Sequence, residues 1–214
     1  MLGLYREYVL PHLVERVLGG SGWADWRERT TQGLVGTVVE IGFGSGLNVP
    51  HYPDEVDQVY AVEPALRARR LAEGRIADSH ARVEHVGLDG ARLPLADDSC
   101  DGALSTFTLC TIPDVASALS ELRRVLRPGG VFHFLEHGLA PERRMARLQR
   151  TLEPAQKFFA DGCHLTREPA SLVRDAGFEL TAVESRYVGA RAPWNYLTLG
   201  VATARATQAS MSTP

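Results

Sequence analysis

The chain has 214 residues, of which 44% are hydrophobic and 23% are charged, and this length fits one globular domain with a buried core but no second catalytic domain. Its formal net charge of −3 lacks the basic excess of nucleic-acid-binding proteins, so we expect no nucleic-acid partner. No apolar run approaches the roughly 20 residues that a membrane-spanning helix needs.

The first predicted element is a helix that precedes the first strand. Its apolar positions form a loose stripe at helical spacing, interrupted by Pro11: Leu4, Tyr8, Leu13, Val17 and Leu18. We predict a helical cap over residues 1–34 that docks on the core, and a lid or a peripheral membrane contact through this helix is the alternative. No basic segment followed by an apolar core marks a secretory signal, so we expect a cytoplasmic protein.

The rest of the chain alternates short apolar runs with longer amphipathic ones, which is the pattern of parallel strands joined by crossover helices. The fold class is therefore α/β. The predicted strands are Thr37–Ile41, Gln58–Val62, Ala81–Val86, Asp101–Thr106, Val131–Glu136, Glu179–Tyr187 and Tyr196–Ala202. The predicted helices are Leu47–Tyr52, Leu66–Ala77, Asp114–Leu126, Pro141–Phe159 and Glu168–Asp175.

A glycine-rich loop follows the first predicted strand, in the stretch VVEIGFGSGLNVP. The strand ends near Glu40, and Gly42, Gly44 and Gly46 follow at every second position. Glycine lets a ligand approach the backbone, and a loop of this kind at the carboxyl edge of a parallel sheet is typical of nucleotide binding. The alternative is a turn whose glycines only permit close packing of the strand against the next segment.

The spacing of the loop selects among nucleotide ligands. The dinucleotide fingerprint needs a glycine where this chain has Leu47. The observed E-x-G-x-G-x-G resembles motif I of the class I S-adenosylmethionine-dependent methyltransferases, in which the methionine part of the ligand lies along the loop. The resemblance implies a cofactor set that begins with Glu40, Gly42, Phe43, Gly44, Gly46 and Asn48.

Two further segments extend this resemblance. Glu63 and Pro64 end the second strand, where a carboxylate can accept hydrogen bonds from two vicinal ribose hydroxyls, although a solvated strand end is the alternative. The segment GLDGARLPLADDSCDGAL resembles the family's adenine-binding segment, with Cys100 in place of the usual phenylalanine. The resemblance implies that Asp89 accepts from the adenine amino group. The remaining members of the implied cofactor set are Gly90, Ala91 and Thr106.

The resemblance also implies a fold and a cofactor. LRRVLRPGGVFHFLE matches the family's helix and fifth strand, so we expect a Rossmann-like, doubly wound, seven-stranded and mostly parallel sheet with helices on both faces. The cofactor that the resemblance implies is S-adenosylmethionine. The methyltransferase domain is expected over residues 35–205, with inserted acceptor-side helices over 138–177 and a flexible tail over 206–214.

The second half of the sequence indicates which class of methyl acceptor the protein uses. STFTLCTIPD lacks the N/D-P-P-Y/F motif of enzymes that methylate amide or exocyclic amino nitrogens. LCTIPD, VLRPGGVFHFLEHGLA and LEPAQKFFADGCHLTRE resemble the methyltransferase-like family that includes the alkyl-thiol S-methyltransferases. This resemblance implies a small, fairly apolar acceptor, first of all a thiol. A phospholipid or quinone acceptor and a non-catalytic cofactor-binding module are the alternatives, and the oligomeric state is left open.

Three residues are candidates for the chemistry. A thiol with a pKa near 8.5 can lose its proton to a neutral histidine, and His137 directly follows the fifth strand, at the edge where ligands bind. His164 and Asp161 lie in the inserted segment. A histidine that only caps the strand, and a structural pair between Asp161 and Arg167, are the competing interpretations.

The sequence also predicts which residues supply the acceptor pocket and in which state the cysteines are. The aromatic or apolar residues expected to supply the acceptor pocket, or else the core, are Tyr5, Tyr8, Trp23, Trp26, Phe158, Phe159 and Trp194. Cys100, Cys110 and Cys163 show no CxxC or zinc-type spacing, so we expect free thiols and no metal.

Overall fold

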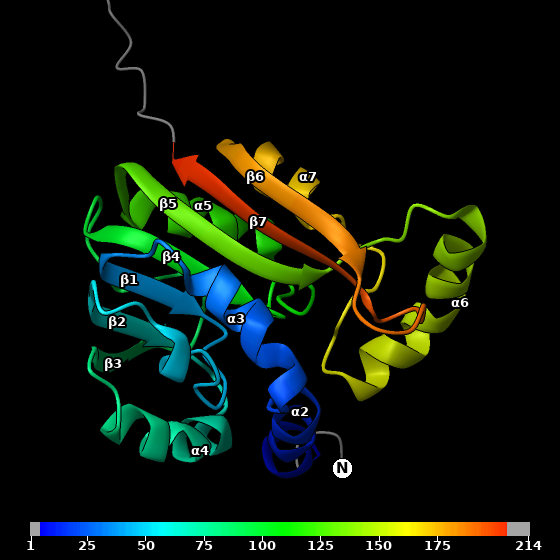
Figure 1. Ribbon diagram of the computed structural model, residues 1–214, viewed down its shortest axis with the longest axis horizontal. Coiled ribbons are helices and arrows are strands. Elements are labelled where there is room, and N and C mark those ends of the chain that lie inside the picture. Colours follow the sequence, from blue (N-terminus) through cyan, green and yellow to red (C-terminus); the bar gives the residue numbers. More distant parts are fainter. Residues whose placement is uncertain (1–4, 205–214) are drawn as a thin grey trace, which may run out of the picture.

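The computed structural model describes residues 5–204 and has a seven-stranded sheet at its centre (Figure 1). The strands are β1 (Gly36–Ile41), β2 (Val56–Val62), β3 (Arg82–Gly87), β4 (Cys100–Thr106), β5 (Leu126–His137), β6 (Phe178–Tyr187) and β7 (Tyr196–Ala204), in the spatial order β3-β2-β1-β4-β5-β7-β6. The first five strands are parallel, and β7 lies antiparallel between β5 and β6. The predicted mostly parallel, doubly wound sheet is confirmed.

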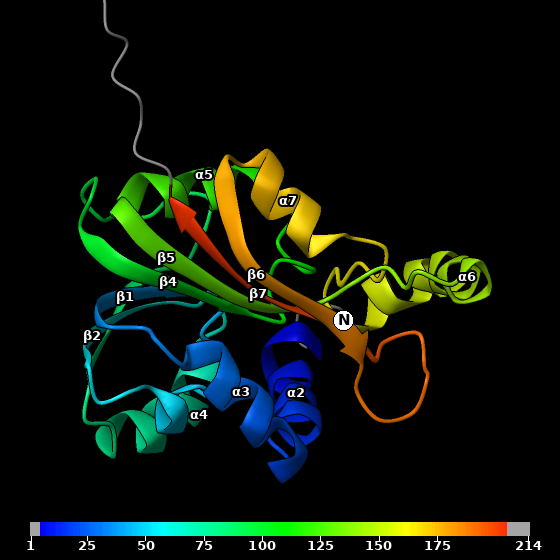
Figure 2. The same cartoon turned by 45° about the horizontal axis from the view of Figure 1, so that its top comes forward.

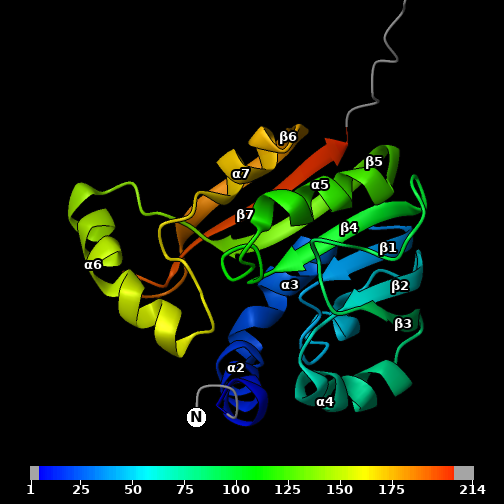
Figure 3. The same cartoon turned by 180° about the vertical axis from the view of Figure 1, so that it is seen from behind.

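Helices cover both faces of the sheet. They are α2 (Leu10–Leu18), α3 (Ala24–Thr31), α4 (Leu66–Ala77), α5 (Val115–Val125), α6 (Arg143–Phe159) and α7 (Pro169–Asp175), with short turns η1 (Tyr5–Val9), η2 (Ser21–Trp23) and η3 (Val49–His51). Figure 2 shows α2, α3 and α4 on one side of the sheet, and the view from behind in Figure 3 shows α5 and α7 across the other side. None of the helices in the described part of the chain combines the length and the apolar character that crossing a bilayer requires.

The alternation of side chains along the strands builds two cores. On β1, Val38 packs in the cluster that includes Ala72 of α4, and the next residue, Val39, packs in the cluster that includes Leu122 of α5 and Val173 of α7. Strands whose successive side chains point to opposite faces, and which are covered on both faces, become apolar throughout. The run of buried residues at the end of β1 follows from this double cover.

The strand order determines where a ligand can bind. The chain moves outward from β1 to β2 and β3 on one side, and to β4 and β5 on the other. The order therefore reverses between β1 and β4, and ligands of open α/β sheets bind in the crevice beyond the carboxyl ends of such strands. The glycine loop after β1 and the turn after β4 lie at this position.

Two predicted elements differ from the structure. The predicted helix Leu47–Tyr52 is wrong, because only the short turn η3 forms there. Pro50 lacks an N–H to donate, and Tyr52 precedes a proline, which disfavours a helical conformation. Strand β5 begins at Leu126, before the proline and glycines expected to precede it, because Leu126 pairs with Cys100 at the start of β4.

The inserted segment divides into two parts with different surroundings. Helix α7 packs on the sheet through the buried Val173, in the same cluster as Phe178 of β6. Helix α6 projects beyond the sheet, beside the carboxyl end of β5 (Figure 1). Only the α6 part of this segment can therefore border a site at that edge. Leu4 of the predicted stripe and the predicted tail at 206–214 lie outside the described residues.

Candidate functional site

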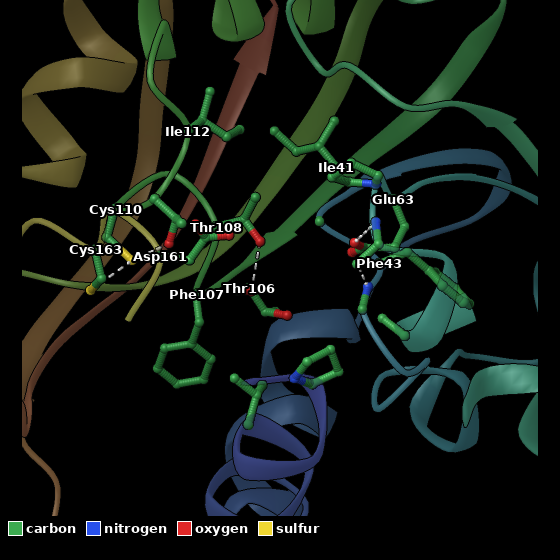
Figure 4. Close-up of a pocket in the computed structure, with 18 of the residues that line it drawn as sticks. Ile41, Phe43, Glu63, Thr106, Phe107, Thr108, Cys110, Ile112, Asp161 and Cys163 are labelled. Atoms are coloured by element: carbon green, nitrogen blue, oxygen red, sulfur yellow. Dashed lines mark hydrogen bonds between the residues drawn. The ribbon is translucent and has the colours of Figure 1, made fainter. Parts of the chain in front are cut away.

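A cavity of about 450 Å³ lies at the carboxyl edge of the parallel strands, within the range of pockets that bind small molecules. Its wall combines the glycine loop, the ends of β2, β4 and β5, helix α2 and the segment that follows α6. Figure 4 shows Glu63 and Phe43 on one side of the cavity and Cys110 and Cys163 on the other. The two sides differ in chemistry.

The three glycines of the loop are required for different reasons. Gly42 has a positive φ of 67°, and a Cβ there would collide with the side-chain oxygen of Thr108 at 1.9 Å, so the loop can pass this close to the β4 turn only with glycine. Gly44 lines the cavity, where a Cβ would meet only open space and the carbonyl oxygen of Gly42 at 3.8 Å. Gly46 does not line the cavity and packs instead against Ala72 of α4.

Glu63 is held at the cavity wall by two backbone donors. Its Oε2 accepts from the Gly44 N–H and its Oε1 accepts from the Ala65 N–H, both at 2.8 Å. Burial raises the pKa of this carboxyl, and the two backbone hydrogen bonds oppose the effect. A carboxylate oxygen has more than one acceptor site, so both oxygens can still accept from a bound ligand.

Most of the other predicted cofactor residues also reach the cavity. Phe43, Asn48, Pro64, Asp89, Gly90 and Thr106 line it together with Gly42, Gly44 and Glu63. Asp89 is exposed, and its Oδ1 accepts from the Ala91 N–H at 2.9 Å. Ala91 itself is not part of the lining. Its backbone therefore orients Asp89.

Glu40 has a supporting position beneath the loop. It is 1% exposed and does not line the cavity, and it accepts hydrogen bonds from Asn48 Nδ2 at 2.8 Å and from the Tyr52 hydroxyl. Burial raises the pKa of Glu40 to about 7. The structure therefore gives Glu40 the task of holding Asn48 and Tyr52 in place, and it does not support the direct cofactor contact expected from the motif.

Arg27 is a cavity residue that the sequence analysis missed. It lies on α3, is 4% exposed, and donates from Nη1 to Asn48 Oδ1 at 2.7 Å and from Nη2 to the Leu18 carbonyl at 3.2 Å. Burial lowers the pKa of Arg27 to about 10, which leaves the guanidinium charged at neutral pH. One arginine in a polar helix gives no local signal, because its burial arises only when α3 docks beside the glycine loop.

Helix α2 closes part of the cavity. Its inner residues Leu10, Pro11, Val14 and Leu18 line the wall, whereas its outer face leaves Leu13 and other apolar side chains exposed. The carboxylate of Glu15 on α2 accepts a hydrogen bond from the hydroxyl of Ser45 in the glycine loop. Its Oε1 also accepts from Nη2 of Arg75 on α4 at 2.5 Å. The helix thus contacts the site on one side while its outer face stays in contact with solvent.

The other side of the cavity is apolar, and Phe107 forms part of its wall. Phe107 directly follows β4 with a positive φ of 55°, an uncommon conformation for a residue with a side chain. Its ring packs against Trp23 and His137, with centroid distances of 5.3 and 5.2 Å. Ile112 and Pro113 continue this wall.

None of the seven aromatic residues expected in the acceptor pocket, or else in the core, lines the cavity, so the pocket interpretation is wrong. The core alternative holds for Trp26 and for Trp23, which packs against the same cluster. Trp26 is buried in the core, and Tyr8, Phe158, Phe159 and Trp194 are exposed on the surface. The apolar wall comes from α2 and from Phe107 to Pro113 instead.

His137 lies among sulfur atoms at this apolar side. Its Nδ1 is 3.6 Å from Cys110 Sγ and 3.8 Å from Cys163 Sγ, and the two sulfur atoms are 3.5 Å apart. All three residues line the cavity. The contact with Cys110 and the nearby His137 lower the pKa of Cys163, whereas the contact with Cys163 and burial raise the pKa of Cys110.

The two other candidates for chemistry differ in position. Asp161 lines the cavity with a positive φ of 49°, next to the Cys163 segment. His164 is not part of the cavity lining, and its Nδ1 lies 3.3 Å from Glu153 Oε1. The structure therefore brings His137 and Asp161 to the site and assigns His164 a contact with α6. Arg167 donates to the carbonyls of Leu109 and Ile112, which fastens the turn that carries Cys110.

Comparisons with known proteins agree with this geometry. A model of the methyltransferase domain matches residues 39–134. The thiol S-methyltransferase TMT1B of Rattus norvegicus is 36% identical over 152 residues, which cover 69% of this chain and 62% of that protein. The thiol S-methyltransferase TMT1A of Homo sapiens is 34% identical over 146 residues, which cover 66% of this chain and 59% of that protein.

Solved structures show the same fold. The crystal structure of an S-adenosylmethionine-dependent methyltransferase from Mesorhizobium loti matches with a TM-score of 0.64 at 19% sequence identity, covering 87% of this chain and 99% of that one. The strand order, the glycine loop and these matches agree. The chain thus carries a methyltransferase domain of the class I, S-adenosylmethionine-dependent fold and resembles the thiol S-methyltransferases.

Proposed function

We propose that this protein transfers a methyl group from S-adenosylmethionine to the sulfur of a small, fairly apolar thiol. The observation that carries the proposal is one cavity in which a polar, nucleotide-type side continues into an apolar side that ends at His137 and two cysteines. The naming of the rat and human relatives as thiol S-methyltransferases supports the choice of acceptor.

The polar side fits the cofactor. Glu63 lies at the wall with acceptor capacity for two ribose hydroxyls, and Asp89 is exposed at the position expected for the adenine amino group. Gly44 leaves room for the methionine part. The buried guanidinium of Arg27 supplies positive charge near Asn48, which suits the methionine carboxylate.

The apolar side fits the acceptor. The wall presents hydrocarbon and aromatic surface from Leu10, Val14 and Phe107, which favours an alkyl or aryl group over a charged one. Burying a second charged molecule here would cost free energy without a partner. The same wall lies next to His137, against which the ring of Phe107 packs.

The protein contributes to the reaction mainly by placing the two reactants next to each other. S-adenosylmethionine supplies a methyl group already activated on a sulfonium sulfur, and the net reaction converts it and a thiol into S-adenosylhomocysteine, a methyl thioether and one proton. Correct placement of two reactants can be worth about 7–11 kcal/mol of the barrier. His137 has the position to assist loss of the thiol proton at the acceptor side.

The test is the identification of the methylated product by mass spectrometry. Purified protein is incubated with S-adenosylmethionine and a panel of small alkyl and aryl thiols, quinols and phosphatidylethanolamine. We expect a methyl thioether from at least one thiol, with the activity lost in Glu63→Ala and kept in Glu73→Ala, which alters an exposed glutamate of α4.

Two results would contradict the proposal. Methylation of only the quinols or of phosphatidylethanolamine would replace the thiol by another acceptor class. Tight binding of S-adenosylhomocysteine without product from the whole panel would favour a cofactor-binding protein without turnover.

A further inference from the structure

The cavity contains a cluster of three potential metal ligands from distant parts of the chain. Cys110 follows β4, His137 ends β5 and Cys163 follows α6. One ligand atom from each lies within 4.8 Å of the other two. Cys110 and Cys163 are 2% and 4% exposed, and both sulfurs are on the cavity wall.

The spacing of these atoms fits a tetrahedral zinc site. Zinc binds cysteine sulfur at about 2.3 Å and histidine nitrogen at about 2.0–2.1 Å, so at tetrahedral angles two sulfur ligands are about 3.8 Å apart and a sulfur and a nitrogen about 3.5 Å. The observed distances are 3.5 Å between the sulfurs and 3.6 and 3.8 Å from His137 Nδ1 to each sulfur. Each edge of the ligand triangle therefore agrees to within about 0.3 Å.

Backbone hydrogen bonds hold the segments that carry Cys110 and Cys163, and His137 pairs with Leu197 of β7. The buried carboxylate of Glu136 accepts from the N–H groups of Thr108, Leu109 and Cys110, at 3.0, 3.0 and 3.3 Å. The His164 N–H donates to the Cys110 carbonyl at 2.8 Å, which joins the Cys163 segment to the β4 turn. The triangle is therefore a fixed feature of the fold, and metal binding would need little rearrangement.

The donor set and its position indicate the kind of metal site. Thiolate and imidazole ligands favour zinc among the common divalent cations. Structural zinc sites have four protein ligands, whereas three protein ligands in a cavity leave the fourth position open to water or substrate. Phe107, whose ring packs against His137, borders the same cavity and would place an aromatic group beside a ligand at the fourth position.

We infer that Cys110, His137 and Cys163 form a zinc site whose fourth position binds the sulfur of the acceptor thiol. The role of the metal rests on the proposed function, whereas the metal site itself does not. On binding, the sulfur–hydrogen bond of the acceptor breaks, the proton leaves to water, and the sulfur electron pair coordinates zinc. In the transfer, that sulfur forms a bond to the methyl carbon while the carbon–sulfonium bond breaks towards the cofactor sulfur. The neutral thioether then leaves the metal.

The site explains why the cysteines escaped detection in the sequence. The spacing of the three ligands along the chain matches no zinc motif, because they come from the turn after β4, the end of β5 and the segment after α6, which meet only at the sheet edge. His137 then serves as a ligand through Nδ1, and the metal takes over the lowering of the thiol pKa.

The first experiment measures metal binding without any methyl transfer. Full-length protein, stripped with a chelator and kept reduced, is loaded with zinc or with cobalt(II), desalted and analysed for bound metal and for the absorption bands of cobalt–thiolate coordination. We expect about one metal per chain and thiolate bands. The loss of either ligand cysteine, in Cys110→Ser or Cys163→Ser, should weaken zinc binding at least about 100-fold, since second-shell changes alone cost 10–100-fold.

A matched control is provided by Cys100, which is buried at the start of β4 and outside the cavity lining. Cys100→Ser should keep the metal and the cobalt spectrum. Thermal unfolding of each variant shows whether a loss of metal reflects misfolding, and zinc should raise the melting temperature of the wild type and Cys100→Ser only.

The second experiment tests the open position. Addition of a small alkyl thiol to the cobalt protein, with no S-adenosylmethionine present, should change the thiolate bands, whereas the corresponding alcohol should not. No metal binding by reduced wild-type protein, equal binding by folded Cys163→Ser, or the recovery of a Cys110–Cys163 disulfide despite reductant would overturn the metal site. Metal binding with no response to thiols would overturn its role in acceptor binding. Neither result depends on whether a methylated product is found.

Discussion

The two sides of the cavity are built in different ways. The cofactor side is made of backbone groups and carboxylates that follow directly on β1, β2 and β3, so each contact comes from a short continuous segment. The acceptor side is formed by α2, the turn after β4, His137 and the loop after α6, which are far apart in the chain. Changes on the first side should therefore act on cofactor affinity, and changes on the second should act on turnover with affinity kept.

The largest effect is expected for Glu63→Ala on the cofactor side. Two hydrogen bonds from ribose hydroxyls to a charged acceptor are each worth about 1.5–3 kcal/mol, so the affinity for S-adenosylhomocysteine should fall about 100-fold or more. Isothermal titration calorimetry measures this loss, with Glu73→Ala as the control. An affinity close to that of the wild type would remove Glu63 from the cofactor site.

The second prediction compares variants of two histidines, one on the cavity wall and one outside it, to distinguish effects on turnover from effects on cofactor affinity. His137→Gln should lower turnover about 100-fold, because both proposed roles of His137, assistance in the loss of the thiol proton and coordination of zinc, need its imidazole. Its affinity for S-adenosylhomocysteine should stay within about two-fold of the wild type, since the residue lies on the other side. His164→Gln is the matched control, and it should keep the wild-type turnover because His164 contacts Glu153 outside the cavity. Equal losses in both variants would contradict the division into sides.

The third prediction tests whether Arg27 belongs to the cofactor side. Arg27→Met keeps much of the hydrocarbon stem but removes the charge, and the lost interaction with the methionine carboxylate should cost about 2 kcal/mol, or roughly thirty-fold in affinity. Arg29→Met, two residues along α3, is the control because Arg29 pairs with Glu184. Adenosine, which lacks the carboxylate, should bind the Arg27 variant and the wild type equally.

The fourth prediction concerns stability and should have the smallest effect on turnover. The folded protein holds the proton of Glu40 up to about pH 7, whereas the ordinary value is 4.5, so the unfolded chain binds fewer protons between these values. Stability should therefore fall as the pH rises through this interval, by at most about 3 kcal/mol.

The comparison variant for this fourth prediction is Glu40→Gln, which keeps an acceptor for Asn48 and has no charge to bury. Its stability, measured by urea unfolding, should change less between pH 4.5 and pH 7 than that of the wild type. Parallel pH curves for the two proteins would show that Glu40 does not carry the extra proton.

The same contrast explains what the sequence could predict. Glu63, Asp89 and the glycine loop directly follow strands, so locating the strands also locates them, and the structure places each at the cavity. The fold followed from the alternation of apolar runs, because strands covered on both faces must be apolar throughout.

The acceptor side, and Arg27 on the cofactor side, could not be found in this way. Arg27 is buried only because α3 docks there, and the apolar wall comes from a helix whose sequence stripe does not reveal which face turns inward. The meeting of Cys110 with Cys163 depends on how the loop after α6 crosses the β4 turn, which the separation of 53 positions does not encode. The predicted helix Leu47–Tyr52 is wrong because Pro50 and Pro53 outweigh the amphipathic pattern from which it was predicted.

The backbone of Phe107 has a consequence for changing the acceptor by protein engineering. Its positive φ suits β-branched replacements worst, and its ring packs against Trp23 and His137, so most substitutions at this position would lose both ring contacts. Val14 is on the cavity wall too, but it belongs to a helix with a largely exposed surface and tolerates changes of size without disturbing the sheet. Directed evolution towards larger or smaller acceptors should therefore accumulate its mutations in α2 and leave Phe107 unchanged.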